Sequence, residues 1–149
     1  MKIEEEIKQP KFRNDHQKAV VNLMYTSGWL SARQEEFFRP FGITPSQFNI
    51  LRILRGQAGK SLSGAEIKAR MLERNSDISR LLDRMSRKKL VERHQCPNDK
   101  RATDITITPE GLRILKEIDV QIDRAEKDLF HLTRDEARML SNLLDKARG

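Results

Sequence analysis

The stretch NSDISRLLDRMSRKKLVERHQCPNDKRATDITITP, residues 75–109, contains two different patterns in succession. In its first half, apolar residues recur at the spacing of a helix with one buried face. These residues are Ile78, Leu81, Leu82 and Met85. In its second half, two short runs rich in branched residues flank a turn that contains Pro97, Asn98 and Asp99. The stretch therefore predicts a helix followed directly by a β-hairpin.

The other face of the predicted helix contains arginines and short hydroxyl side chains. With Asn75 or Ser76 as the N-cap, helical spacing turns a polar set away from the apolar stripe: Ser76, Ser79, Arg80, Asp83, Arg84 and Arg87. The predicted hairpin has Lys100 and Arg101 at its tip. Taken alone, each feature has an ordinary explanation as a solvated helix face or a solvated turn. Together they favour an anionic binding partner whose surface has a groove.

Residue types that commonly begin helices occur both before and after this stretch. The predicted N-caps are Asn14, Thr44, Ser63, Thr108 and Thr133. The helix that begins at Asn14 is long and ends at the Pro- and Gly-containing break of residues 39–42, and a few extended residues precede Ser63. The charged residues 1–10 are predicted to be a mobile lead-in. The fold class is therefore mainly α with a small β-hairpin.

A helix, a short helix, a tight break, a cationic helix and a two-stranded hairpin follow one another in a winged helix-turn-helix. The major groove of B-DNA admits one α-helix, whose N-terminal residues reach base edges. The predicted DNA-binding residues on this recognition helix are Ser76, Ser79 and Arg80, with Asn75 and Arg84 as additions. At the hairpin tip, Arg101 is long enough to enter the minor groove, Asp99 is placed to hold it extended, and Lys100 is left for phosphate.

The charge distribution agrees with this partner. The 149-residue chain has 29 Lys and Arg against 22 Asp and Glu, a net charge of +7, which favours nucleic acid or an anionic membrane surface. Residues 60–101 alone contain twelve Lys and Arg against six Asp and Glu, so the excess falls in the predicted DNA-binding part. The N-terminus lacks the apolar core of a signal peptide, and no run approaches the roughly 20 apolar residues of a membrane span. These features predict a cytoplasmic protein with no membrane partner.

The segments GITPSQFNILRIL, NSDISRLLDRMSRKKLVER and NDKRATDITITPEGLRIL resemble the second helix, the recognition helix and the wing of MarR-type (multiple antibiotic resistance regulator) bacterial transcription factors. The resemblance covers about residues 14–149. Its most specific element is an acid followed two residues later by arginine, here Asp99 and Arg101. It implies a homodimeric winged-helix repressor, or less often an activator, that binds a pseudo-palindromic operator in double-stranded DNA and is often released by a small ligand.

The resemblance also implies that the first and last helices form the dimer. In the helix after Thr108, apolar residues alternate at steps of three and four, as in a coiled-coil seam. We favour a dimer seam, with internal core as the alternative. The predicted dimerisation residues are Leu115, Ile118, Ile122, Ala125, Leu129, Leu140 and Leu143. We predict one domain over residues 1–149, in which residues 1–38 and 109–149 dimerise and residues 44–108 bind DNA.

Two further features concern regulation and geometry. The aromatic and sulfur side chains of the first long helix are candidates for an effector pocket between the dimer helices and the DNA-binding lobe, with core packing as the alternative: Met24, Tyr25, Trp29 and Phe37. Lys89 stands where the family commonly has glycine, just before the chain leaves the recognition helix. Because a non-glycine residue adopts a left-handed helix cap only at some cost, we expect this helix end to be built differently.

Other function classes have weaker support. The sequence has no Gly-rich phosphate loop and no serine or cysteine with a histidine and an acid at motif spacing, so we predict no enzyme. His94 and Cys96 supply only two of the four ligands of a structural zinc site, and we predict no metal or other cofactor. Cys96, beside cations that would favour the thiolate, is a candidate thiol sensor. The alternative function is a winged helix that packs DNA or binds proteins without a preferred site.

Overall fold

The structure is a computed structural model that describes residues 1–97 and 99–149, with the side chains of residues 100 and 101 outside that description. Its elements in chain order are α1 (Ile3–Glu6), α2 (Asp15–Phe38), the 3-10 helix η1 (Arg39–Phe41), α3 (Pro45–Arg55), β1 (Leu62–Ser63), α4 (Gly64–Arg70), α5 (Ile78–Arg87), β2 (Val91–Cys96), β3 (Asp99–Ile107), α6 (Pro109–Leu129) and α7 (Arg134–Arg148). This order confirms the predicted fold class. None of the described helices is long and apolar enough to cross a membrane.

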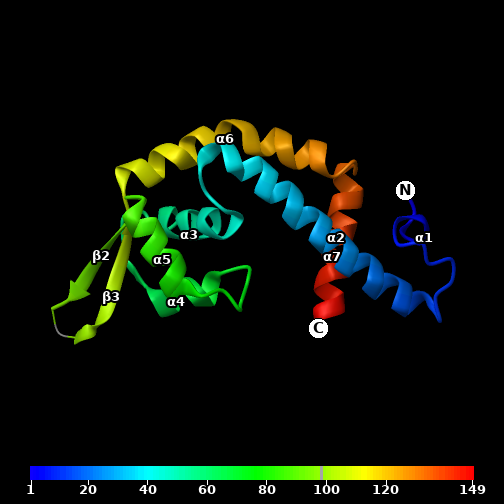
Figure 1. The fold of residues 1–149 in the computed structure, drawn as a ribbon, viewed down its shortest axis with the longest axis horizontal. Helices are drawn as coiled ribbons and strands as arrows, with labels where there is room; N and C mark the ends of the chain where they lie inside the picture. The colour runs from blue at the N-terminus through cyan, green and yellow to red at the C-terminus, as the bar shows by residue number, and fades with distance from the viewer. Residues whose placement is uncertain (98) are drawn as a thin grey trace.

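Two long helices arrange the other elements (Figure 1). α6 runs along the top of the view, and α2 descends beneath it toward α1 and α7. The short helices α3, α4 and α5 and the hairpin of β2 and β3 lie below the N-terminal half of α6. The hairpin and the N-terminal end of α2 are therefore at opposite ends of the molecule.

Side-chain caps begin most helices where the sequence predicts them. The Thr44 hydroxyl accepts a hydrogen bond from the backbone N–H of Gln47 at 3.2 Å, and the Gln47 side chain accepts one from the Thr44 N–H at 3.1 Å. Such caps satisfy backbone N–H groups that have no partner in the first turn of a helix. The other predicted caps that are present are Asn14, Ser63, Thr108 and Thr133.

The recognition helix α5 begins later than predicted. Its N-cap is Asp77, whose carboxylate accepts a hydrogen bond from the backbone N–H of Arg80 at 3.2 Å. The predicted caps Asn75 and Ser76 are therefore wrong. An aspartate caps a helix as well as asparagine or serine does, and its negative charge also suits the positive end of the helix dipole.

The predicted hairpin is present within a three-stranded antiparallel sheet of order β1-β3-β2. The extended residues before α4 form β1, in which Leu62 is opposite Ile105 of β3. On the other side of β3, Arg93 of β2 is opposite the same Ile105, and the register shifts between Gln95 and Cys96. The base of the hairpin is thus paired on both sides of β3, and its outer part is paired only between β2 and β3.

The hydrophobic core lies among α3, α4, α5, the sheet and the first half of α6. Its fully buried large side chains include Ile50, Leu51, Ile67 and Met85. Leu115 and Ile118 of α6 are 0% exposed in the single chain and belong to this core, so their assignment to a dimer seam is wrong. The reason is that an amphipathic helix has nearly the same apolar spacing whether it packs on its own chain or on a partner.

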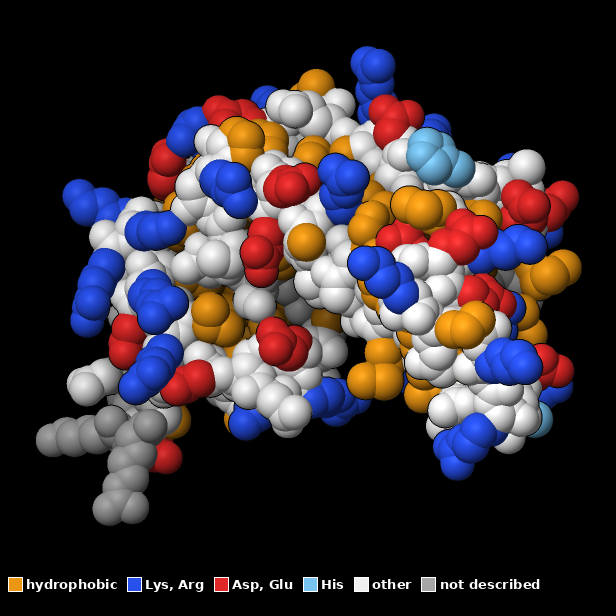
Figure 2. Space-filling model, turned by 45° about the vertical axis from the view of Figure 1, so that its right-hand side comes forward, with side chains coloured by type: hydrophobic (Ala, Val, Ile, Leu, Met, Phe, Trp, Pro, Cys, Tyr) orange, Lys and Arg blue, Asp and Glu red, His pale blue; other side chains and the backbone are white. Residues whose placement is uncertain are grey.

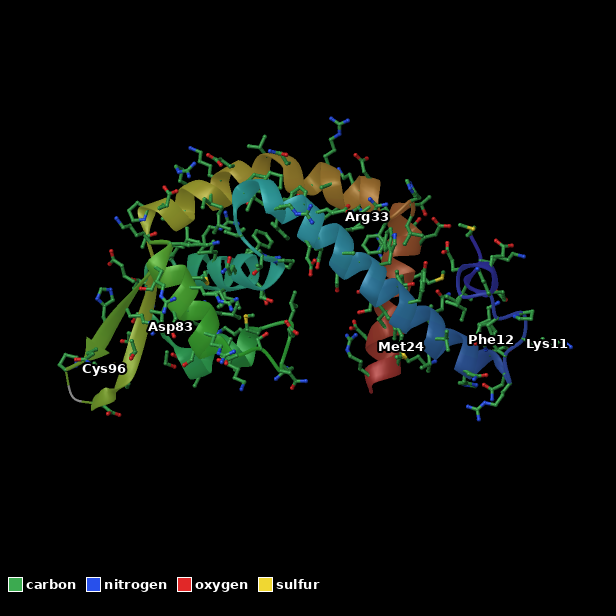
Figure 3. The ribbon with its side chains drawn as sticks, viewed as in Figure 1. Lys11, Phe12, Met24, Arg33, Asp83 and Cys96 are labelled. Carbon is green, nitrogen blue, oxygen red and sulfur yellow. The ribbon has the colours of Figure 1, made fainter. Side chains whose placement is uncertain are left out.

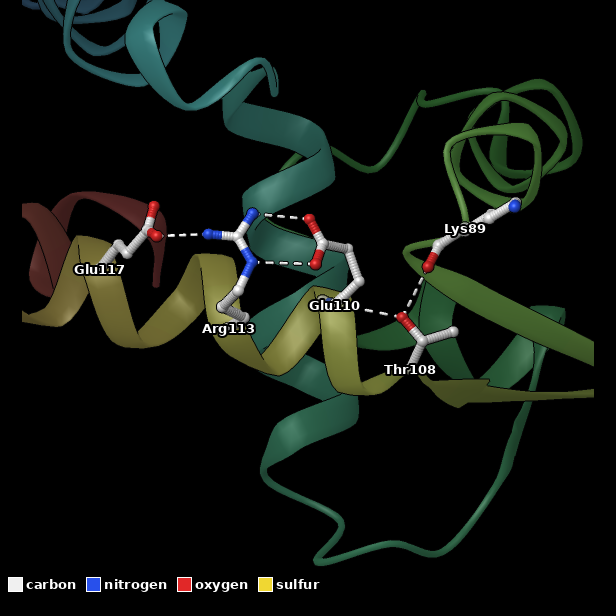
Figure 4. A network of polar contacts seen from close by, with 6 residues as sticks. Lys89, Thr108, Glu110, Arg113 and Glu117 are labelled. Atoms are coloured by element: carbon white, nitrogen blue, oxygen red, sulfur yellow. Dashed lines mark hydrogen bonds and ion pairs between the residues drawn. The ribbon is translucent and has the colours of Figure 1, made fainter.

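A left-handed residue, Lys89, closes the end of α5 with a φ of 58°. The N–H groups of Lys89 and Leu90 donate to the carbonyls of Ser86 and Met85, both at 2.9 Å, which is the pattern of a Schellman cap. The Thr108 hydroxyl donates to the Lys89 carbonyl at 2.7 Å (Figure 4). The expectation of a differently built helix end is therefore wrong. Lysine here adopts the conformation that glycine adopts freely.

Replacing Lys89 with glycine is expected to stabilise the protein. The left-handed conformation costs a side-chain-bearing residue about 1–2 kcal/mol, and the larger entropy of glycine in the unfolded chain offsets part of that gain. We expect Lys89→Gly to raise the free energy of unfolding by about 0.5–1 kcal/mol, measured by urea denaturation. Arg87→Gly, in the last turn of the same helix, is the control and should lower it by a similar amount. A loss of stability in Lys89→Gly would contradict the observed cap.

The first ten residues contain a helix, although the sequence predicts a mobile lead-in. α1 packs on the first half of α2, and Ile3 is buried. The Lys18 ammonium lies 2.5 Å from a carboxylate oxygen of Glu4, and the Tyr25 hydroxyl donates to Glu6 at 2.7 Å. The hydrogen bond from Lys18 holds the pKa of Glu4 below its ordinary value. Contacts between residues far apart in sequence thus order this segment.

Candidate nucleic-acid interface

The recognition helix α5 has one buried and one exposed face, as predicted. Ile78, Leu82 and Met85 are buried. The exposed residues include Ser79, Arg80, Asp83, Arg84 and Arg87. The side chain of Arg80 is 80% exposed and extends from the first turn, the part of a helix that reaches base edges in the major groove. With three arginines against one aspartate, this set of exposed residues has a net positive charge.

Ser76 does not belong to this exposed face. It is buried, and its hydroxyl lies 3.0 Å from the Glu73 carbonyl and 3.2 Å from a carboxylate oxygen of Glu73. The same carboxylate oxygen accepts a hydrogen bond from Ser46 at 3.3 Å. The outward orientation predicted for Ser76 is therefore wrong, because its hydroxyl helps to fix the loop before α5 to the start of α3. Asn75 is exposed, and its DNA contact stays a prediction.

The wing is the hairpin of β2 and β3. Asp99 begins β3, beside the turn that joins the two strands. The side chains of Lys100 and Arg101 lie outside the described residues. The predicted phosphate contact of Lys100, the minor-groove contact of Arg101 and the support from Asp99 therefore stay predictions.

Cys96 lies at the far end of β2 (Figure 3). Partial burial, with Asp104 and Asp99 nearby, raises the pKa of its thiol. The thiolate on which a thiol sensor depends is thus disfavoured, contrary to the expectation from sequence. His94 is 3.2 Å from the Thr106 hydroxyl. Among the described residues, no three His, Cys, Asp or Glu side chains gather as they would around a metal ion.

A cleft of about 1510 Å³ is lined by residues of α2, α3 and α6 and of the loop before α5. Figure 2 shows the surface hollowed between the two halves of the molecule. Trp29 and Phe37, two of the predicted pocket residues, line this cleft. Met24 is 70% exposed elsewhere on α2 (Figure 3), and Tyr25 is bonded to Glu6, so their assignment to the pocket is wrong. Both lie nearer the start of α2 than the cleft extends.

The helix α7 has no buried residue in the single chain, although it is amphipathic. Leu140 and Leu143 are 40% and 57% exposed. The first half of α2 also has large exposed apolar side chains, among them Val20, Leu23 and Met24. Figure 2 shows hydrophobic side chains at the surface of the part of the molecule that contains α7 and the first half of α2. Extended apolar surface of this kind marks a contact site for another molecule.

The other predicted dimerisation residues lie near the cleft. Ile122, Ala125 and Leu129 of α6 are half-buried and line it. Ile122 also packs against the core. The structure therefore divides the predicted set: Leu115 and Ile118 are core, the next three residues line the cleft, and the two leucines of α7 are exposed.

Several residues that fix the recognition helix were not predicted as functional. Arg93 of β2 donates to Asp83 of α5 at 2.7 Å, and the Lys88 ammonium donates to the Gly42 carbonyl at 2.6 Å. Glu73 holds the loop before the helix, as described above. The Lys88 and Glu73 contacts reach elements that are far apart in sequence, and the Arg93 contact depends on how β2 packs against α5, so no local pattern predicts them. The identity of Arg93, a lone cation on a predicted strand, is the one weak signal.

The helix-turn-helix of α4 and α5, with a cationic exposed face and an adjoining β-hairpin, defines a winged-helix DNA-binding protein. The model of the MarR family matches residues 41–102 of the chain. The chain is 31% identical to the uncharacterized HTH-type transcriptional regulator YsmB of Bacillus subtilis over 77% of each protein. It is also 31% identical to the multiple antibiotic resistance protein MarR of Salmonella typhimurium, over 74% of this chain and 76% of that protein.

A solved structure extends the similarity to a DNA complex. A cysteine-to-serine mutant of MarR from Escherichia coli, complexed with operator DNA, superimposes with a TM-score of 0.74 at 29% identity, over 85% of this chain and 91% of that chain. The chain belongs to the MarR family. It is a DNA-binding transcriptional regulator, as the sequence predicts.

Proposed function

We propose that the protein is a homodimeric repressor that binds a pseudo-palindromic operator and is released from it by a small molecule. Residues 1–149 form one domain, in which residues 1–38 and 109–149 make the dimer and residues 44–108 bind DNA. The observation that supports this best is a cationic recognition helix in the same chain as an amphipathic α7 with no buried residue. Such a helix gains stability by packing on a partner.

In the proposed complex, the two recognition helices of the dimer enter successive major grooves. Ser79, Arg80 and Arg84 contact bases or phosphates there, and the half-sites are about one helical turn apart. The two wings lie over the flanking minor grooves, with Arg101 inserted and Lys100 on phosphate. Occupancy of the operator then blocks RNA polymerase.

The proposed effector site is the cleft lined by Trp29 and Phe37. The cleft borders both α2 and the loop before α5, so a ligand there touches the proposed dimer part and the DNA-binding part together. A ligand that binds the released state more tightly than the DNA-bound state shifts the population toward release by that difference in affinity.

Two other functions have less support. An architectural or protein-interaction winged helix predicts no preferred DNA site, whereas YsmB is a transcriptional regulator and the Escherichia coli MarR mutant is complexed with operator DNA. The same relatives favour a regulator over an enzyme. A regulator of this kind works in the cytoplasm, where bacterial DNA is located.

Replacing Leu143 with glutamate is expected to dissociate the dimer. A carboxylate buried in an apolar interface without a partner is strongly unfavourable. We expect light scattering to give twice the chain mass of 17.4 kDa for the wild type and the single-chain mass for Leu143→Glu. Leu72→Glu is the matched control, because Leu72 is 83% exposed but lies in the loop before α5, outside the proposed dimer part. A variant Leu143→Glu with the wild-type mass would show that α7 is outside the interface.

In vitro transcription tests the proposed repression. A template whose promoter overlaps the preferred site should give less transcript as the dimer is added, and a template with that site scrambled should not. Equal transcript from both templates at saturating protein would refute repression by occupancy.

A further inference from the structure

One arginine connects the wing to two turns of the recognition helix. The guanidinium of Arg93 on β2 donates to a carboxylate oxygen of Asp83 at 2.7 Å and to the backbone carbonyl of Ser79 at 3.2 Å. Ser79 and Asp83 are four residues apart and therefore lie one above the other on α5. The planar guanidinium, with its fixed donor directions, holds both at once. Figure 3 shows Asp83 on α5, on the side of the molecule where the hairpin lies.

The position of Arg93 on the hairpin allows this contact to hold the hairpin against α5. We call the hydrogen bonds of Arg93 to Asp83 and to the Ser79 carbonyl the brace. Arg93 is opposite Ile105, which is buried and is paired with β1 on its other side. The strand that Arg93 occupies is thus anchored at its base to the core. Beyond the next residue of β3, Asp104, which is also paired with β1, the hairpin has only the β2–β3 pairing, with a register shift near its end. The Arg93 contact is therefore placed to set the angle between the hairpin and α5.

We propose that Arg93, through Asp83 and the Ser79 carbonyl, is a positioning residue for DNA binding that fixes the wing relative to the recognition helix. Simultaneous entry of the helix into the major groove and of the wing into the minor groove requires one relative orientation of the two elements. Because the brace already holds this orientation in the free protein, binding does not have to offset the entropy cost of ordering the two elements on the DNA. This inference rests on the proposed binding of an operator through both elements.

Two other roles for Arg93 predict different results. As a direct phosphate ligand, it would act through its own charge, and Asp83 would weaken binding by repelling the DNA backbone. As a purely structural residue, it would act through folding alone. Removal of Asp83 separates these roles, because general electrostatics predicts tighter DNA binding by the less acidic variant, and positioning predicts weaker binding.

The test compares Asp83→Ala with Glu92→Ala by fluorescence anisotropy on the preferred duplex. Glu92 is the strand neighbour of Arg93, and its removal deletes the same charge without touching the brace. We expect Asp83→Ala to bind about tenfold more weakly, with an unchanged salt dependence and an unchanged urea midpoint, and Glu92→Ala to bind at least as tightly as wild type. Asp83→Glu, which keeps a carboxylate on α5, should recover part of the loss. Binding of Asp83→Ala as tight as that of Glu92→Ala would overturn the proposal.

A second readout needs no DNA. In the variant Arg87→Cys, spin labels at positions 87 and 96 report the distance between α5 and the hairpin. We expect the additional change Asp83→Ala to broaden this distance distribution. An unchanged distribution would overturn the brace. Absence of any preferred duplex for the wild type would overturn the proposed function instead, so the two failures are distinguishable.

Discussion

Gly111→Ala is expected to lower the free energy of unfolding by about 1–2 kcal/mol, because inserting one methyl group into this packed site costs about 2–3 kcal/mol and alanine's higher helix propensity offsets about 1 kcal/mol. A Cβ at this position would lie 2.6 Å from the Leu90 carbonyl oxygen, 2.8 Å from the Ile107 side chain and 3.2 Å from the Leu51 side chain. The closest atom is backbone and belongs to the exit of the recognition helix. It cannot rotate away as a side chain can, so α6 has to move away from the hairpin base.

Helix propensity opposes this loss but does not cancel it. Alanine is favoured over glycine inside a helix by about 1 kcal/mol, so at a site without steric conflict the change would raise the free energy of unfolding. Gly64→Ala is the matched control: its Cβ would meet only Ile78, at 3.9 Å, which is an ordinary contact. Urea denaturation of the two variants checks the prediction. Equal stabilities of Gly111→Ala and the wild type would show that the α6 start is not packed as described.

Removal of the two predicted base-reading arginines is expected to have the largest effect on DNA binding. Arg80→Ala and Arg101→Ala should each weaken binding to the preferred duplex by on the order of 1–3 kcal/mol. Arg80→Ala should relax sequence preference within the half-sites, because bidentate arginine contacts read bases in the major groove. Arg101→Ala should relax preference in the flanks, because a minor-groove arginine reads width and A·T content. Competition titrations with mutated duplexes measure both losses.

Arg124→Ala provides the control for charge. Arg80 lies 3.6 Å from the Asp77 carboxylate, and Arg124 is likewise an exposed helical arginine 3.6 Å from an acid, Asp128, but it lies in the second half of α6. It should change affinity only slightly, through net charge. If Arg80→Ala and Arg124→Ala lose affinity equally and neither changes the preferred sequence, Arg80 makes no base contact.

The elements could be predicted from the sequence where local chemistry determines them. Thr44 and Thr108 begin helices because their hydroxyls satisfy backbone N–H groups three residues later, and that signal is contained in a few neighbouring residues. The sequence misplaces the cap of α5 because Asn75, Ser76 and Asp77 are all good capping residues. In the structure the Ser76 hydroxyl bonds to Glu73, and Asp77 is the cap.

Whether an apolar helix face packs in the core or stays exposed could not be predicted in the same way. Leu115 and Leu143 have similar spacing within their helices, yet the first is core and the second is exposed. The brace between Arg93 and Asp83 was also missed, because it depends on the packing of β2 against α5. Lys89 is a different case: the sequence indicates the conformational cost of a left-handed lysine, but the hydrogen bonds around it hold the left-handed cap in place.

Selection from a pool of random DNA duplexes tests the central claim most directly. The wild-type protein is incubated with the pool at near-physiological salt, and the retained duplexes are sequenced. We predict enrichment of a two-fold-symmetric site whose half-sites are about one helical turn apart. Retention without enrichment, lost steeply as salt rises, would contradict a sequence-specific regulator and indicate a protein that binds DNA through its charge alone.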